Sequence, residues 1–175
     1  LELLDNGSIR AAEKNSDGLW NVNPWVKEGI LVGFRLGTVS KMSKDTETLP
    51  FFDKDTYPVK SIDSLSENIR IVPGGTSIRS GSFINRDAVL MPPCYVNVGA
   101  YIDEGTMLDS HSLVGSCAQV GKRCHIAAGA QIGGVLEPIN ANPCIVEDDV
   151  IMGINTSIAE GVVLKEGVVL APGVN

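Results

Sequence analysis

The chain has 175 residues, of which 43% are hydrophobic, 20% are charged and only 5% are aromatic, and its formal net charge is −7 with a pI near 4.8. This acidic balance argues against a nucleic-acid-binding surface, because phosphate binding needs a basic face. The length allows a repeat domain with a small appendage, and the scarcity of aromatic residues means that small aliphatic side chains must fill its core.

Cysteine usage, together with the lack of a signal peptide or a membrane-spanning run in the sequence, indicates a reduced, cytoplasmic setting. The four cysteines show no CxxC spacing, and the sequence has neither a signal peptide nor an apolar run long enough to span a bilayer. None of the cysteines has a base at a motif spacing, so a cysteine nucleophile is not favoured. The first residue is not Met and the last, LAPGVN, stop inside a repeat, which predicts a fragment of a longer protein.

The first 70 residues have a mixed pattern. Residues 9–22 predict a β-hairpin with its turn at Ser16, Asp17 and Gly18. Residues 23–36 predict one amphipathic helix, with Asn23 as N-cap and Pro24 in its first turn. Residues 41–60 are polar with two prolines, so we interpret them as a loop or linker.

A strict period of six begins at Val72. Apolar residues then recur at every sixth position and resume, after a slip of two, at Val146. The positions are Val72, Ile78, Ile84, Leu90, Val96, Ile102, Leu108, Val114, Val120, Ile126 and Ile132, then Val146, Met152, Ile158, Leu164 and Leu170. A small residue stands four positions after each anchor from Thr76 to Ala130, and glycine recurs three positions after many anchors. This period fits neither a helix nor a flat strand.

A solenoid with three short faces and eighteen residues per coil explains the pattern. Each anchor would point into a narrow interior, and glycine would relieve each corner. The predicted fold class is therefore mainly β, a parallel β-helix over residues 71–175 preceded by a small α/β region over residues 1–70. The break near residues 133–144 carries two extra residues and two prolines, which indicates an external loop where a ligand would bind.

Long non-repetitive strings narrow the assignment further. "MPPCYVNVGAYIDEGTMLDSHSLVGSCAQVGKRCHI", "GGVLEPINANPCIVEDD" and "DGLWNVNPWVKEGILVGFRL" closely resemble the tetrahydrodipicolinate N-succinyltransferase family, and the resemblance runs from about Leu3 to Gly173. It implies a left-handed coil, although parallel crossovers are generally right-handed. It also implies succinyl-CoA as co-substrate, no metal, an amino dicarboxylate as acceptor in diaminopimelate and lysine biosynthesis, and a homotrimer with active sites between subunits.

The resemblance assigns substrate contacts to two charged residues. The family's substrate-binding Asp corresponds to Asp109 in "GTMLDSH", where a carboxylate can orient an ammonium group and accept its proton. The family's Arg corresponds to Arg70 in "NIRIVPGG", where a guanidinium can hold a carboxylate. From spacing alone Asp109 can equally cap a turn, and Arg70 can equally be a solvated residue at a domain boundary.

Two positions depart from the family pattern. A Glu that the family places after the loop is Ser157 here, and serine cannot replace a carboxylate base. Glu160, three residues on, is the substitute we predict as catalytic, against the alternative of a solvated side chain beside a corner glycine. The family Trp two residues after the Asp is His111, which either contacts the substrate or covers the corner, and we expect His125 to face solvent.

The CoA arm is expected near Ala127, Gly133 and Gly134, where small side chains would let pantetheine approach backbone amides. The two glycines can also simply make the turn into the loop.

Three other functions are alternatives for a protein with this repeat. A zinc carbonic anhydrase on this scaffold needs three histidines, and the chain has two. An acyltransferase with an acetyl donor or an amino-sugar acceptor shares the repeat but not the "DEGTMLDSH" and "GGVLEP" strings. A non-catalytic trimeric β-helix subunit is favoured somewhat by Ser157.

Overall fold

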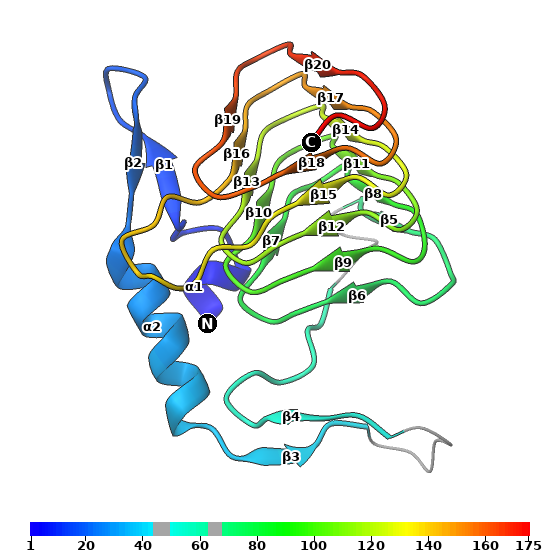
Figure 1. Cartoon of the computed structure of the whole chain (residues 1–175). Helices are drawn as coiled ribbons and strands as arrows, with labels where there is room; N and C mark the ends of the chain where they lie inside the picture. The colour runs from blue at the N-terminus through cyan, green and yellow to red at the C-terminus, as the bar shows by residue number, and fades with distance from the viewer. Residues whose placement is uncertain (44–49, 63–67) are drawn as a thin grey trace.

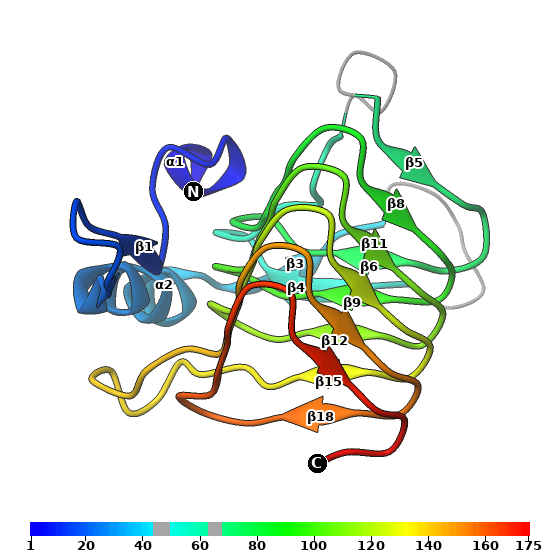
Figure 2. The ribbon, with the colours of Figure 1, turned by 90° about the horizontal axis from the view of Figure 1, so that it is seen from above.

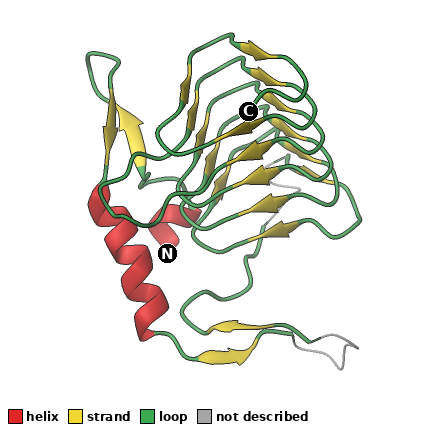
Figure 3. Cartoon of the chain, viewed as in Figure 1, coloured by secondary structure: helices red, strands yellow, loops and turns green. Residues whose placement is uncertain are grey.

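Aliphatic residues at every sixth position fold most of the chain into a stack of three-sided coils. We describe a computed structural model that covers residues 1–43, 50–62 and 68–175, and Figure 1 shows the coils rising from β6 to β20. Each side of a coil carries one two-residue strand, and the corners between the strands are turns, as Figure 3 shows. The strands are β5 (Arg70–Ile71), β6 (Ser77–Ile78), β7 (Phe83–Ile84), β8 (Val89–Leu90), β9 (Tyr95–Val96), β10 (Tyr101–Ile102), β11 (Met107–Leu108), β12 (Leu113–Val114), β13 (Gln119–Val120), β14 (His125–Ile126), β15 (Gln131–Ile132), β16 (Ile145–Val146), β17 (Ile151–Met152), β18 (Ser157–Ile158), β19 (Val163–Leu164) and β20 (Val169–Leu170).

The strands form three parallel sheets that wrap one interior. Their orders are β19-β16-β13-β10-β7, β20-β17-β14-β11-β8-β5 and β18-β15-β12-β9-β6. Strand partners are one coil apart, as in Tyr101 opposite Gln119, so each coil takes eighteen residues. Seen from above, the chain runs clockwise from β18 through β19 to β20 while it rises towards the viewer, which is a left-handed coil (Figure 2). The predicted left-handed parallel β-helix is confirmed.

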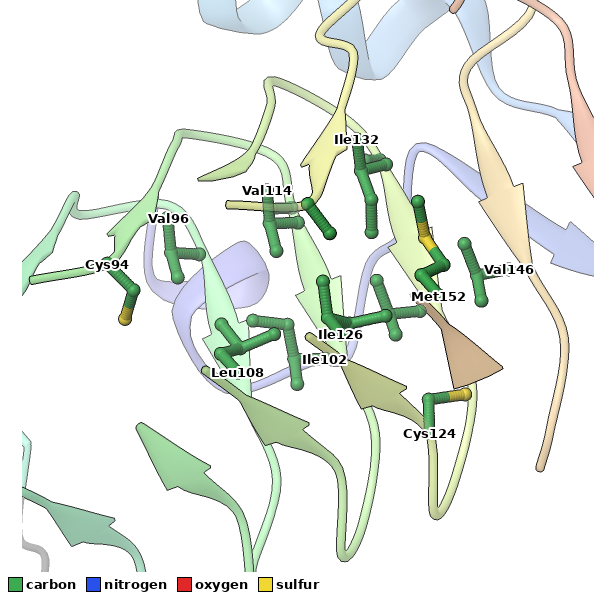
Figure 4. Close-up of a cluster of buried hydrophobic side chains, with 14 of the residues drawn as sticks. Cys94, Val96, Ile102, Leu108, Val114, Cys124, Ile126, Ile132, Val146 and Met152 are labelled. Atoms are coloured by element: carbon green, nitrogen blue, oxygen red, sulfur yellow. The ribbon is translucent and has the colours of Figure 1, made fainter. Parts of the chain in front are cut away.

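The six-residue anchors make the core. Leu90, Val96, Ile102, Leu108 and Ile126 are completely buried, and Figure 4 shows such side chains from all three sheets converging on the coil interior. The small residues four positions after each anchor are buried beside them from Ser82 to Ala130. A narrow interior filled in this way needs few aromatic side chains, as the composition predicts.

Where a corner contains a residue with positive φ, that residue stands three positions after the anchor at all regular corners. Glycine supplies it at most corners, as predicted, for example at Gly99 and Gly105. The remaining corners use residues that do carry a side chain in the left-handed conformation, and these are Asp87, His111, Cys117, Arg123, Asp149 and Asn155. Because a side chain at such a corner points outward from the turn, these positions place functional groups on the edges of the column.

Two details of the predicted register are wrong. The first anchor is Ile71, which stands opposite Leu90, and not Val72, because one extra residue enters the corner that contains Gly74 and Gly75. The loop at residues 133–144 inserts eight residues and not two, since Val120 pairs with Val146, 26 positions on instead of eighteen. Periodicity alone could not separate an insertion of eight from one of two, because the two differ by one complete repeat.

The N-terminal region packs on one edge of the column. The predicted hairpin is confirmed as β1 (Ala12–Lys14) and β2 (Trp20–Val22), and the predicted helix as α2 (Pro24–Leu36) with Asn23 as N-cap. Val26 and Ile30 of α2 are buried against Val98 and Cys117 of two coil corners. A short helix, α1 (Glu2–Asp5), was not predicted.

The interpretation of residues 41–60 as a loop is wrong in part. β3 (Val39–Lys41) and β4 (Phe52–Lys54) form an antiparallel hairpin, and residues 44–49 between them lie outside the described part of the chain. No helix among the described residues has the length and apolar character to span a membrane.

Glu147 ties the first hairpin to the column. Its carboxylate is 7% exposed and accepts from Trp20 Nε1 at 2.8 Å and from the backbone N–H of Glu166 at 3.2 Å, with Lys14 and Lys165 3.2 and 3.3 Å away. Burial alone would raise the pKa of Glu147, but these donors outweigh it and lower the pKa to about 2.

Glu147 is expected to make stability depend on pH. Because its pKa is lower in the folded state, its contribution of about 2 kcal/mol is complete above the unfolded value and is lost as pH falls towards 2. Thermal unfolding of Glu147→Gln should therefore show a smaller loss of melting temperature between pH 5 and pH 2.5 than the unchanged protein. The exposed Glu28→Gln is the control, and equal pH slopes in all three proteins would contradict the assignment.

Gly99 and Gly18 provide a matched test of corner packing. Both have φ of +77°, but a Cβ on Gly99 would lie 2.7 Å from Cys117 Sγ and 3.0 Å from Ile30 Cδ1, whereas nothing lies within 4 Å of one on Gly18. Gly18→Ala should cost about 1 kcal/mol for its backbone conformation alone. Gly99→Ala should cost about 2 kcal/mol more, because the corner and α2 cannot both keep their places. Equal losses in melting temperature for the two variants would refute the close contact.

Candidate active site

One outward face of the column carries most of the predicted substrate residues. We call the outward side of the sheet β20-β17-β14-β11-β8-β5, with the corners that follow its strands, the Asp109 face. Leu108 points into the core, so Met107 and Asp109 on either side of it point outward. In this sheet Arg70, Val89, Met107 and His125 stand opposite one another in four successive coils. Arg70, Asp109 and His125 thus share a face although 55 residues separate the first from the last.

Asp109 both caps a turn and keeps one oxygen free for other partners. Its Oδ1 accepts the backbone N–H of Ser110 at 2.7 Å, so the turn-capping interpretation is correct for that atom. Its Oδ2 lies 3.8 Å from His125 Nε2, and the side chain is 31% exposed. Capping fixes the orientation of the carboxylate, which leaves the second oxygen aimed along the face.

His111 occupies the corner beside Asp109. Its φ is 62°, its N–H donates to Pro93 O at 2.6 Å, and its carbonyl accepts from Gln131 Nε2 at 3.1 Å. The backbone is therefore held by the coils on both sides while the imidazole is exposed at the edge. Ala127 lies one coil above Asp109 in the same column, and its small, buried side chain leaves the surface there without bulk.

The other predicted site residues lie on a different edge. Asp109 and His111 follow a strand of the Asp109 face, whereas Gly133, Gly134 and Glu160 follow β15 and β18 of the next sheet. The structure therefore does not bring Glu160 beside Asp109 within one chain. A complete sheet, β18-β15-β12-β9-β6, separates the two edges.

The two glycines have a packing reason that involves no ligand. A Cβ on Gly134 would lie 2.5 Å from the backbone nitrogen of Ser116, and one on Gly115 would lie 2.2 Å from that of Gly134. A Cβ on Gly133 would lie 3.0 Å from Ile158 O. The start of the loop thus packs directly against the coils on both sides. This close packing requires glycine there, which supports the alternative that the two glycines only make the turn into the loop.

Lys27 is a buried residue of this second edge that sequence reasoning missed. It has no exposed surface, and its Nζ donates to the carbonyl oxygen of Ala141 in the loop. Burial lowers the pKa of Lys27, while nearby Cys117 and Glu160 favour its charged form. Its burial could have been predicted from its position three residues before Ile30, because that spacing places it on the buried face of the helix. Figure 1 shows the loop reaching towards α2 at this point.

The cysteines are poor nucleophiles. All four are buried, and burial raises the pKa of Cys117 to about 12 and the pKa values of Cys124 and Cys144 to about 11. Among residues 1–43, 50–62 and 68–175, no three His, Cys, Asp or Glu side chains are grouped so that they could hold a metal ion.

The fold and face together define the class of protein: a hexapeptide-repeat, left-handed parallel β-helix with an arginine, a carboxylate and an imidazole on one outward face. Residues 1–36 match the family model described as the N-terminal part of tetrahydrodipicolinate N-succinyltransferase. Three proteins named 2,3,4,5-tetrahydropyridine-2,6-dicarboxylate N-succinyltransferase, from Nitrobacter hamburgensis, Bradyrhizobium diazoefficiens and Pelagibacter ubique, are 45%, 46% and 48% identical to the chain.

Each alignment covers 99% of this chain and 62 to 64% of the relative. The chain is therefore homologous to the tetrahydrodipicolinate N-succinyltransferase family over almost its whole length, and the predicted resemblance is confirmed. It spans a little under two thirds of the length of these relatives.

The contact between Lys27 and the loop gives a local prediction. Lys27→Met keeps the apolar stem but removes the donor to Ala141 O, a bond of a charged donor that contributes about 1.5 to 3 kcal/mol. Amide hydrogen exchange in residues 133–144 should speed up about tenfold or more. Lys41→Met, at an exposed position, is the control. Unchanged loop exchange in Lys27→Met would show that this contact does not hold the loop.

Proposed function

We propose that the chain forms the β-helix part of a succinyltransferase that moves a succinyl group from succinyl-CoA to the amine of ring-opened tetrahydrodipicolinate, in the diaminopimelate route to lysine. The observation that carries this proposal is the common face of Arg70 and Asp109, in a chain about 45% identical to proteins named for that activity. Glu160 is the other predicted carboxylate, and it lies on a different edge from Arg70.

The spacing of the two residues suits an elongated amino dicarboxylate. Arg70 lies two coils from the strand that precedes Asp109, which is roughly 10 Å at the usual strand spacing of about 4.8 Å. The guanidinium of Arg70 is exposed and can form two parallel hydrogen bonds with a substrate carboxylate. The ammonium group at the other end of the molecule would then lie at the end of the face that carries Asp109.

The chemistry requires a neutral amine. An alkylammonium group ordinarily titrates near 10, so it must lose a proton before its lone pair can attack the thioester carbonyl. The new C–N bond forms as the C–S bond breaks, and CoA leaves as a thiolate that takes up a proton. A positioned acid–base group contributes roughly 10²- to 10⁴-fold to such a step.

Several finer assignments belong to the same proposal. Succinyl-CoA would approach past Ala127, where the face is flat, and no metal takes part. Gly133, Gly134 and Glu160 lie one edge away, so they would reach the acyl donor or the amine of a neighbouring subunit in a homotrimer. A cytoplasmic location is proposed with them.

Asp109 provides the test of the site. Asp109→Asn preserves the acceptor for the Ser110 N–H through its amide oxygen but removes the charge, so turnover should fall by about 10²-fold or more while the melting temperature and the oligomeric state remain unchanged. CoA release, followed with a thiol reagent, measures this. Asp87→Asn, at a corner of β7 and β8, is a control that should keep full activity. Unchanged kinetics in Asp109→Asn would reduce Asp109 to a turn residue.

The alternatives are separated by the choice of substrates. Purified protein would be assayed with succinyl-CoA and acetyl-CoA, each against amino dicarboxylates and an amino sugar. We expect succinyl-CoA with an amino dicarboxylate to give the highest kcat/KM. Preference for acetyl-CoA or the amino sugar would indicate a different N-acyltransferase, and no CoA release with any amine would support a non-catalytic subunit.

A further inference from the structure

We propose that His125 is the proton acceptor of this site and that Asp109 acts through it by orienting the imidazole. The inference rests on the proposed function, since it names the group that removes the proton from the ammonium of the substrate. Its position before an anchor predicts only that His125 faces solvent, and spacing alone does not link it to Asp109.

The two edges of the His125 ring have opposite environments. The side chain is 45% exposed, yet its Nε2 is buried and has no hydrogen-bond partner among the described residues. Asp109 Oδ2 lies 3.8 Å from that nitrogen. The exposed part of the ring therefore includes the edge that carries Nδ1, on the outward side of the Asp109 face.

A buried imidazole nitrogen without a partner is unusual, because nearly all buried polar groups in native proteins are hydrogen-bonded. Asp109 Oδ2 is the complementary group, since Oδ1 is already occupied by the Ser110 N–H. The separation is longer than a hydrogen bond, and such catalytic contacts commonly tighten when substrate binds. Once tightened, the contact would fix the proton on Nε2 and leave the lone pair of Nδ1 facing outward.

The neighbours of His125 leave this pair undisturbed. In the same outward row, Met107 lies one coil below and Ile151 one coil above, and neither carries a charge. Ala127, the next outward-facing residue after His125 along the chain, has only a methyl group as its side chain. Among the described residues, the side chains directly below and above His125 in this sheet therefore carry no charge that would repel an ammonium group.

An imidazole suits the task better than a carboxylate. Imidazole is a stronger base than a carboxylate and is the commonest general base in enzymes. The ammonium N–H would break as its proton moves to Nδ1, and the freed amine would attack the thioester. The imidazolium, stabilised by Asp109, would then return this proton to the departing CoA sulfur. The attacking nitrogen would release its second proton to solvent as the C–S bond breaks, which leaves a neutral amide and restores the starting state of the site.

The experiment compares His125→Ala with Ile151→Ala, which stands opposite His125 in the next coil and is exposed on the same face. His125→Ala should lower kcat about 100-fold with KM for the acceptor changed less than about threefold. Added imidazole should restore part of the lost rate in a saturable manner. Ile151→Ala should stay within about threefold of the unchanged protein and should not respond to imidazole.

A double variant tests whether the two residues act as a unit. Asp109→Asn combined with His125→Ala should be about as slow as the slower single variant, because Asp109 cannot affect the rate by orienting a base that is absent. His125→Gln, which keeps a polar side chain but accepts no proton, should be as slow as His125→Ala.

The outcomes that overturn the inference are distinct from those that overturn the proposed function. Activity of His125→Ala within threefold of the unchanged protein, a loss that imidazole does not relieve, or multiplying losses in the double variant would remove His125 from the chemistry and leave the succinyltransferase proposal intact. No CoA release by the unchanged protein with any acceptor would remove both.

Discussion

The width of the coil interior is the constraint on which the rest of the structure depends. Three inward side chains per coil must fill a space that admits one aliphatic residue from each side, so an anchor such as Leu108 is followed by another exactly six residues later wherever the coil is regular. At most corners the residue in the third position after the anchor has positive φ. Every outward side chain is then fixed in height and direction by its distance from an anchor.

This fixed geometry gives the edges of the column different roles. The edge that follows β9, β12, β15 and β18 is covered by α2 and by the loop at residues 133–144, through Val98, Cys117 and the Lys27 contact with Ala141. The edge that follows the Asp109 face carries His111 with an exposed imidazole and Asp109 with an unoccupied oxygen. The covered edge holds the N-terminal region in place, and the open edge presents the chemistry.

A solenoid also explains how distant residues come to share a site. In most folds a cluster such as Arg70, Asp109 and His125 would need specific long-range contacts between loops. Here it needs only that each residue has the same position relative to its own anchor, because coils stack in register. The residues are consequently spaced along a line. Such a row suits an extended ligand, whereas a compact pocket would need a second column beside the first.

Sequence predicted the parts of the molecule that periodicity controls. The anchors, the small-residue column, the corner glycines, the first hairpin and α2 followed from spacing, because each is imposed by local geometry. The size of the insertion, the shift of the first anchor to Ile71 and the β3–β4 hairpin did not, since they depend on where the chain leaves the repeat. Helix spacing could have predicted the burial of Lys27, but not its contact with Ala141, which joins segments 114 residues apart. Burial of His125 Nε2 could not be predicted either, because it depends on how side chains of neighbouring coils pack.

Whether the Asp109 face is the reaction centre can be decided most directly by a crystal structure of the protein with CoA and an unreactive amino dicarboxylate. Our account predicts a substrate carboxylate on Arg70, the amine at the exposed edge of the His125 ring with Asp109 on the other edge, and the CoA sulfur on the same face near Ala127. A dicarboxylate bound only at the edge of Glu160, Gly133 and Gly134, with the Asp109 face empty, would contradict it.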